Sequence, residues 1–111
     1  MDKADKRAAI NAYKERPLDW GVFAIRCSAS GQVWIGGSRN LTTQQNGLWF
    51  ALRMGGNTHR AVQTAWTEHG EASFSFEPLE RLPADTPVFA RVNLLKERQA
   101  HWRGVLGAEA Y

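Results

Sequence analysis

Four arginines, whose side chains are well suited to gripping phosphate, lie in a stretch of the chain that has no acidic residue. Segment 20–67 contains no aspartate or glutamate, whereas segments 1–19 and 68–111 contain four and seven. A guanidinium group presents a planar fork of N–H donors that matches the spacing of phosphate oxygens. This distribution indicates a polyanionic partner such as a nucleic acid, and the alternative is four charges scattered over an ordinary surface. The four residues are Arg26, Arg39, Arg53 and Arg60.

Length and composition predict one small folded domain. The chain has 111 residues, a net charge of +3 and 43% apolar residues, which include five tryptophans and five phenylalanines. This is enough for one hydrophobic core and leaves no room for a second domain. Cys27 is the only cysteine, so an intramolecular disulfide and a cysteine-based zinc site are excluded. Because no signal-peptide pattern and no apolar run of membrane-spanning length is found, we expect a cytoplasmic protein without membrane contact.

Three segments predict the strands that must position these arginines. Residues 21–27 place apolar side chains on both faces of a strand, and residues 28–31 supply a turn before the apolar run 33–35. This pattern is typical of a β-hairpin with both faces covered. Residues 73–77 alternate between serine and phenylalanine at first, which is the clearest strand periodicity in the chain. We therefore expect a small, largely antiparallel sheet of three strands.

Helices are expected around this sheet, which gives an α+β fold. Asn40 and Thr58 are suited to cap two of the helices, and Thr86 with the following proline is suited to begin the last one. We assign residues 1–19 to an N-terminal helical extension and residues 20–107 to the domain itself. The expected helices span residues 2–16, 41–54, 59–69 and 87–106, and the main apolar stripe of the last one is Val92, Leu95, Gln99, Trp102 and Leu106.

Two tripeptides on the predicted hairpin carry a resemblance to a known family. Gly21-Val22-Phe23, ten intervening residues and then Trp34-Ile35-Gly36 resemble the paired signatures of the GIY-YIG nuclease superfamily. The following loop, residues 37–41, is similar to the family's loop and helix start, and residues 65–80 are similar to its next helix, glycine and third strand. Leu94-Leu95-Lys96-Glu97 resembles the helix segment that carries the family's metal-binding glutamate. The resemblance implies the family's α+β fold, and the element order expected above agrees with it.

The resemblance also implies a chemistry, which is metal-dependent hydrolysis of phosphodiester bonds. The family uses one divalent cation on a glutamate, Mg²⁺ or Mn²⁺, together with tyrosine hydroxyls from both signatures and an arginine on the following helix. The equivalent positions here are Phe23, Trp34, Gln44 and Glu97. Phe23 and Trp34 have no hydroxyl to take a proton from water, and Gln44 brings no charge. Only Glu97 offers the oxygen ligand that these cations prefer.

Two alternatives remain open at the metal position. Counting back from Trp102 as the family's following aromatic residue places the metal ligand at Gln99, which would leave the site without a carboxylate. His101 lies four residues after Glu97 on the same helix face, so it is a further candidate for a metal or a phosphate. Arg39, Arg53 or Arg60 could replace the family's missing arginine from a neighbouring position.

Three functions follow from these residues. The first is an endonuclease with a rearranged metal site, which depends on Glu97. The second is an inactive module of the same fold that binds DNA or RNA, with DNA the expected partner. The third is a protein-interaction domain with no nucleic-acid role, in which exposed tryptophans such as Trp49 or Trp66 anchor a partner. The substitutions favour nucleic-acid binding over cleavage.

Overall fold

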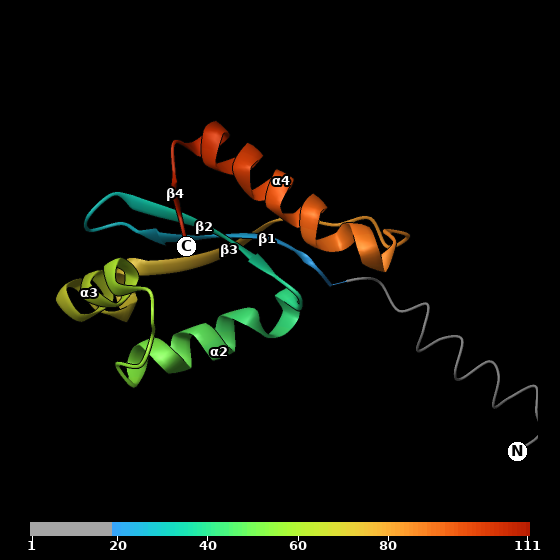
Figure 1. The fold of residues 1–111 in the computed structure, drawn as a ribbon. Coiled ribbons are helices and arrows are strands. Elements are labelled where there is room, and N and C mark those ends of the chain that lie inside the picture. The colour runs from blue at the N-terminus through green and yellow to red at the C-terminus, as the bar shows by residue number, and fades with distance from the viewer. Residues whose placement is uncertain (1–18) are drawn as a thin grey trace, which may run out of the picture.

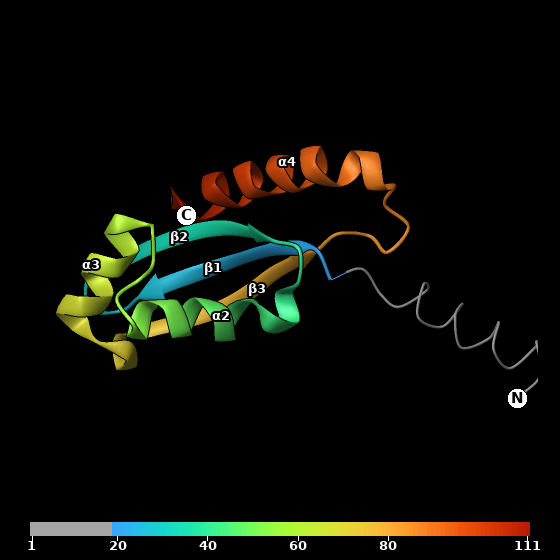
Figure 2. The same cartoon turned by 60° about the horizontal axis from the view of Figure 1, so that its bottom comes forward.

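The fold is a small sheet between two helical layers. The computed structural model describes residues 19–111, so the helix expected over residues 2–16 lies outside the described part. Figures 1 and 2 show α2 and α3 on one face of the sheet and α4 on the other. The elements follow the chain as β1 (Gly21–Cys27), β2 (Gln32–Ser38), α2 (Leu41–Arg53), α3 (Arg60–His69), the short 3-10 helix η1 (Glu71–Ser73), β3 (Phe74–Arg81), α4 (Val88–Leu106) and β4 (Glu109–Ala110).

The sheet has the strand order β3-β1-β2-β4. Strand β1 is antiparallel to both β2 and β3, whereas β4 is parallel to β2. The predicted α+β fold is confirmed, but the sheet has four strands where three were expected. The fourth strand is two residues long, which is too short to produce a hydrophobic periodicity in the sequence.

The pairing of β1 with β2 brings the two signature tripeptides together. Phe23 lies opposite Gly36, and Ile25 lies opposite Trp34. Strand β3 pairs with the other side of β1 and continues past the predicted end at residue 77. It passes through Pro78, which a strand at the sheet edge tolerates because its outer side needs no ladder hydrogen bond.

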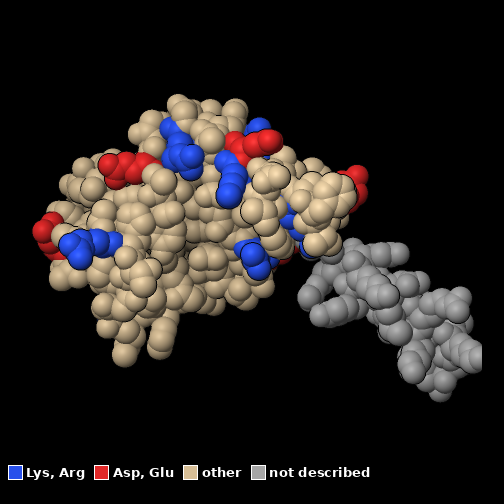
Figure 3. All heavy atoms as spheres, viewed as in Figure 1, with Lys and Arg blue, Asp and Glu red and all other residues tan. Residues whose placement is uncertain are grey.

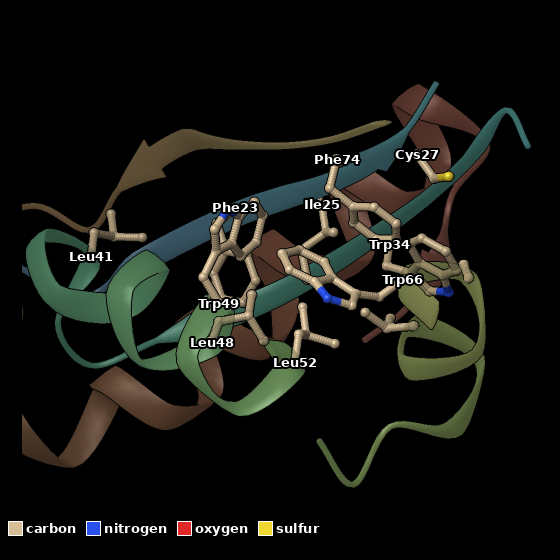
Figure 4. Packing of buried hydrophobic residues seen from close by; sticks show 12 residues of the cluster. Phe23, Ile25, Cys27, Trp34, Leu41, Leu48, Trp49, Leu52, Trp66 and Phe74 are labelled. Atoms are coloured by element: carbon tan, nitrogen blue, oxygen red, sulfur yellow. The ribbon is translucent and has the colours of Figure 1, made fainter. Parts of the chain in front are cut away.

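One face of the sheet is an aromatic core. Phe23, Ile25 and Trp34 point from the strands toward α2 and α3, as Figure 4 shows. Trp49 of α2 and Trp66 of α3 close this core, and each is only 7% exposed. Their rings meet edge to face, with centroids 5.3 Å apart. Neither tryptophan is therefore free to anchor a partner, which removes the residues proposed for a protein-interaction role.

The other face of the sheet is covered by α4. Val22 and Ile35 are fully buried there, and Leu95 and Trp102 of α4 pack against them. Val92 was expected in the same stripe but is 46% exposed. Helix α4 packs on this side of the sheet through Leu95, Trp102 and Leu106, so Val92 lies before the packed part of the helix. Within residues 19–111, no helix combines the length and apolarity required to cross a bilayer.

The N-terminus of α2 is capped from a distant part of the chain. Asn40 occupies the predicted cap position, but its side chain makes no capping hydrogen bond. Instead the carboxylate of Asp19 accepts a hydrogen bond from the backbone N–H of Thr42 at 2.7 Å. The backbone carbonyl of Asp19 also accepts from Leu41 N–H at 2.9 Å. These bonds tie the start of β1 to the start of α2.

The starts of α3 and α4 also differ from the predicted caps. His59, one residue after the expected Thr58, caps α3 because its Nδ1 accepts from the N–H of Val62 at 3.4 Å. Helix α4 begins without a side-chain cap. The hydroxyl of Thr86 donates to the carbonyl of Pro83 at 2.6 Å, so it stabilises the preceding loop and not the helix.

Candidate functional site

The two aromatic residues of the signatures lie entirely inside the core. Phe23 and Trp34 are both 0% exposed. Phe23 stacks on Phe76 with ring centroids 4.9 Å apart, and Trp34 stacks on Phe74 at 6.3 Å. A bound substrate cannot touch either side chain without opening this face of the protein.

Tyr111 covers the first signature from the end of β4. Its ring meets the edge of Phe23 at a centroid distance of 5.9 Å, and its backbone N–H donates to Ile35 O at 2.9 Å. Asn57 donates to its hydroxyl at 2.8 Å, and its ring stacks on His59 at 5.0 Å. Burial raises the pKa of the Tyr111 phenol, although the hydrogen bond from Asn57 acts in the opposite direction. This contact from the last strand helps to exclude water from Phe23.

The indole N–H of Trp34 has no hydrogen-bond partner. It is the single buried side-chain nitrogen or oxygen in the described part of the chain of which this is true. An unsatisfied buried donor costs about 1–3 kcal/mol. The indole could in principle bind a phosphate oxygen, but this donor is directed into the core and contributes nothing at the surface.

Gln44 is held by the turn that joins β2 to α2. Its side-chain oxygen accepts a hydrogen bond from the hydroxyl of Ser38 at 2.7 Å. The same hydroxyl accepts from the backbone N–H of Asn40 at 3.0 Å. The position where the family carries an arginine therefore holds a neutral side chain that fixes the local backbone.

Glu97 and Gln99 point to opposite sides of α4. A Cβ atom placed on Gly37 would lie 2.4 Å from the side-chain nitrogen of Gln99, so this glutamine rests on the strand that carries the second signature. Two residues along a helix correspond to a rotation of about 200°, which turns Glu97 away from the sheet. Glu97 is exposed and lines an open hollow with Asp85 and Asn93.

Two of the four candidate arginines are neutralised by glutamates from the C-terminal part of the chain. Arg26 on β1 pairs with Glu77 on β3. Arg53 binds Glu71 with two hydrogen bonds, from Nε and Nη2, each 2.8 Å long. The bonds from Arg53 hold the pKa of Glu71 below its ordinary value. The segment without acids in the sequence is therefore not free of acids in space.

The other two candidates, Arg39 and Arg60, have no carboxylate oxygen within 4.0 Å among residues 19–111. Arg60 is the first residue of α3 and is exposed. Arg39 follows β2, and its guanidinium carbon lies 5.2 Å from the ring centroid of Trp20. Arg91 of α4 approaches the same ring at 5.8 Å. Trp20, Arg39 and Arg91 form a contiguous group, which we name the Trp20 cluster.

The Trp20 cluster lies beside two ion pairs. Arg81 donates to Asp19 at 2.6 Å, and Nε of Arg98 donates to both carboxylate oxygens of Glu80 at 2.9 and 3.0 Å. Burial acts to raise the pKa of Glu80, but hydrogen bonds from Trp102 and Arg98 outweigh it and lower the pKa. The carboxylates of Asp19 and Glu80 are thus already occupied by arginines outside the cluster.

Comparison with known proteins identifies the fold. No family model and no curated protein matches the chain. Two solved structures do. The catalytic domain of homing endonuclease I-TevI matches with a TM-score of 0.67 and 19% identity, over 82% of this chain and 96% of that one. A glutamate-to-alanine mutant of the catalytic domain of intron endonuclease I-TevI matches with a TM-score of 0.66 and 20% identity, over 79% and 84%. The chain has the GIY-YIG nuclease fold.

GIY-YIG nucleases generally use divalent metals, but the candidate side chains within residues 19–111 do not converge as metal ligands. No three histidine, cysteine, aspartate or glutamate side chains converge within residues 19–111. Around Glu97, the hollow offers Asp85 as a second carboxylate and otherwise includes apolar side chains such as Phe89. His101 is exposed and its ring lies against Trp102 at 5.6 Å. At Gln99, the alternative position, the ligand would be a neutral amide.

The structure does not bring the expected catalytic positions of the GIY-YIG fold into one site. Phe23 and Trp34 face α2 and α3, whereas Gln99 approaches the sheet from α4 on the opposite face. Glu97 faces away from both. Two residues that the sequence pattern did not single out, Trp20 and Arg91, instead join Arg39. The sequence offered only weak signals for these two residues. Trp20 directly precedes the first signature, and Arg91 is one helical turn before the apolar stripe residue Leu95.

Proposed function

We propose that this chain is a nucleic-acid-binding domain of the GIY-YIG fold that does not hydrolyse its ligand. The observation that carries the proposal is the complete burial of Phe23 and Trp34, which fill both signature positions with side chains lacking a hydroxyl. The fold supports a nucleic-acid ligand, because the similar structures are those of an endonuclease domain. We propose DNA as the ligand on the same ground.

Each chemical requirement of hydrolysis lacks a group at the expected place. A general base must reach the attacking water, and neither Phe23 nor Trp34 can accept a proton. Positive charge must stabilise the developing phosphorane, and Gln44 is neutral and bonded to Ser38. A metal needs converging oxygen ligands, and Glu97 is on the outward side of α4. These losses fall on separate elements of the fold, so a single substitution would not repair them.

Binding requires much less than hydrolysis. A nucleic-acid backbone is recognised by cationic side chains that are exposed and not already neutralised. Arg39 and Arg60 meet this condition within residues 19–111, and Arg91 joins them from α4. On the face shown in Figure 3, blue and red groups are interleaved and do not form one continuous basic surface. We therefore expect moderate affinity and a strong dependence on salt concentration.

The test measures binding and cleavage on the same protein preparation. Binding of labelled duplex, branched and single-stranded DNA is followed by fluorescence anisotropy at several salt concentrations. Cleavage of supercoiled, duplex and branched DNA is followed with Mg²⁺ or Mn²⁺, using the Glu97→Ala variant as the matched comparison. The proposal expects salt-sensitive binding without cleavage. Cleavage that disappears in Glu97→Ala would instead establish a rearranged metal nuclease, and an absence of binding would contradict the proposal altogether.

A further inference from the structure

Two guanidinium groups of the Trp20 cluster are held against a single indole. Their carbon atoms lie 5.2 and 5.8 Å from the ring centroid, so they are at most 11.0 Å apart, the sum of these distances. Contact with an aromatic face orients a guanidinium group while leaving its N–H edge free to donate. The two arginines are thus restricted in position before any ligand arrives, which lowers the entropic cost of binding.

The cluster is built from three separate parts of the chain, and hydrogen bonds hold two of its residues, Trp20 and Arg91. Trp20 immediately precedes β1, and its carbonyl accepts from the N–H of Leu82 at 2.8 Å. Arg39 is in the turn between β2 and α2. Arg91 is in the second turn of α4, and its Nε donates to Thr86 O at 3.3 Å. This bond uses Nε, so the two terminal nitrogens of Arg91 are not part of it.

Neither arginine of the Trp20 cluster forms a salt bridge within residues 19–111. Gly21 lies opposite both Ser38 and Arg81, so β1 begins where β2 and β3 end. The carboxylates of Asp19 and Glu80 are each paired with an arginine outside the cluster. Within residues 19–111, no carboxylate oxygen lies within 4.0 Å of the guanidinium nitrogens of Arg39 or Arg91. Both arginines of the cluster are therefore outside the salt bridges of the described residues.

From this geometry we infer that Arg39 and Arg91 bind backbone phosphates of a DNA strand and that Trp20 is the residue that positions them. Two like charges near one another without a counter-ion repel, and a bound phosphate group relieves that repulsion. The site is separate from the buried signature aromatics Phe23 and Trp34, because it lies at the end of the sheet and not under α2 and α3. The inference rests on the proposed function, since it names the part of the surface that holds the nucleic acid.

The experiment compares the salt dependence of DNA binding among matched variants. Anisotropy with labelled duplex and single-stranded DNA is measured for the full chain, for Arg39→Ala, for Arg91→Ala and for both together. Each single variant should reduce the slope of log affinity against log salt by about one, and the double variant by about two. Lys96→Ala removes an exposed cation of α4 that forms no salt bridge within residues 19–111, and it serves as the control, with a smaller change expected.

Two substitutions of Trp20 separate positioning from charge. Trp20→Leu keeps both arginines, so we expect several-fold weaker binding with a nearly unchanged salt slope. Trp20→Phe restores an aromatic face and should recover most of the affinity. Circular dichroism checks that each variant is folded. If the unaltered chain binds DNA but Arg39→Ala and Arg91→Ala behave as Lys96→Ala does, the inference is wrong and the proposed function stands. If the unaltered chain binds no DNA, both are wrong.

Discussion

The burial of the first signature aromatic can be tested by restoring the hydroxyl that the GIY-YIG signature normally carries. Phe23→Tyr adds one oxygen to the para carbon of a ring that is 0% exposed. That carbon lies 2.6 Å from the position of a Cβ atom placed on Gly36, and the ring of Tyr111 also contacts that of Phe23, with centroids 5.9 Å apart. The new hydroxyl would therefore enter a closely packed, apolar environment.

The expected cost follows from this packing. A buried hydroxyl without a partner destabilises a protein by about 1–3 kcal/mol. In a domain of this size, each kcal/mol lowers Tm by roughly 4–8 °C, so we expect a decrease of roughly 4–24 °C. The same change at Phe50, whose side chain is 64% exposed, should alter stability by less than about 0.5 kcal/mol.

Thermal unfolding followed by circular dichroism measures the stability of Phe23→Tyr, Phe50→Tyr and the unaltered chain. Cleavage of supercoiled DNA with Mg²⁺ or Mn²⁺ is assayed on the same samples. We expect a lower Tm for Phe23→Tyr alone and no cleavage by any of the three proteins. An unchanged Tm together with new DNA cleavage by Phe23→Tyr would refute the reasoning, because it would show that position 23 opens onto a working site.

Two further predictions concern the scaffold. Gly21→Ala should destabilise the fold by about 1–3 kcal/mol, because the added Cβ would lie 2.2 Å from the backbone oxygen of Glu80. Gly47 is in the interior of α2, and a Cβ atom added there would meet no atom within 4 Å. Gly47→Ala should therefore stabilise the fold by about 0.5–1 kcal/mol, because alanine favours the helix more than glycine does. Urea unfolding curves of the two variants should shift in opposite directions. The pKa of Asp19 is lowered chiefly by the hydrogen bond from Thr42. The ionised Asp19 carboxylate therefore stabilises the fold fully above its unfolded pKa of 3.8, and this contribution is lost as the pH falls through the lower folded pKa. Asp19→Ala should therefore cost about 1 kcal/mol at pH 7 and progressively less in acid, and an equal loss at pH 2 and pH 7 would contradict the capping role.

The conversion of both signature positions into core residues has a simple physical consequence for this fold. An aromatic ring without a hydroxyl gains free energy when it leaves water, whereas a catalytic hydroxyl must remain accessible. Phe23 and Trp34 therefore favour closure of the face beneath α2 and α3. Tyr111 completes that closure from β4. We propose that the ligand binds instead at the end of the sheet, where the Trp20 cluster lies.

Much of the architecture could be predicted from local sequence. Apolar runs separated by turn residues located β1 and the hairpin, and period-two alternation located the start of β3. The spacing of the two signature tripeptides indicated the GIY-YIG fold, which structural comparison confirms. Residue types alone also showed that Phe23, Trp34 and Gln44 lack the groups used in hydrolysis. These conclusions depend on side-chain chemistry and on contacts between near neighbours in the chain, so they do not require coordinates.

Only the tertiary structure decided which charges meet and which way each helix faces. Arg26 and Arg53 lie in a segment without acidic residues, yet both form ion pairs. The partner of Arg26 is a glutamate 51 residues further along the chain, and that of Arg53 is a glutamate 18 residues further along. The choice between Glu97 and Gln99 depended on the rotation of α4 against the sheet, which a continuous helical pattern leaves open. Likewise Trp20, Arg39 and Arg91 come from three elements and share no sequence pattern. Ion pairs depend on distances in space, so which charged residues pair is decided only when the strands have paired and α4 has packed.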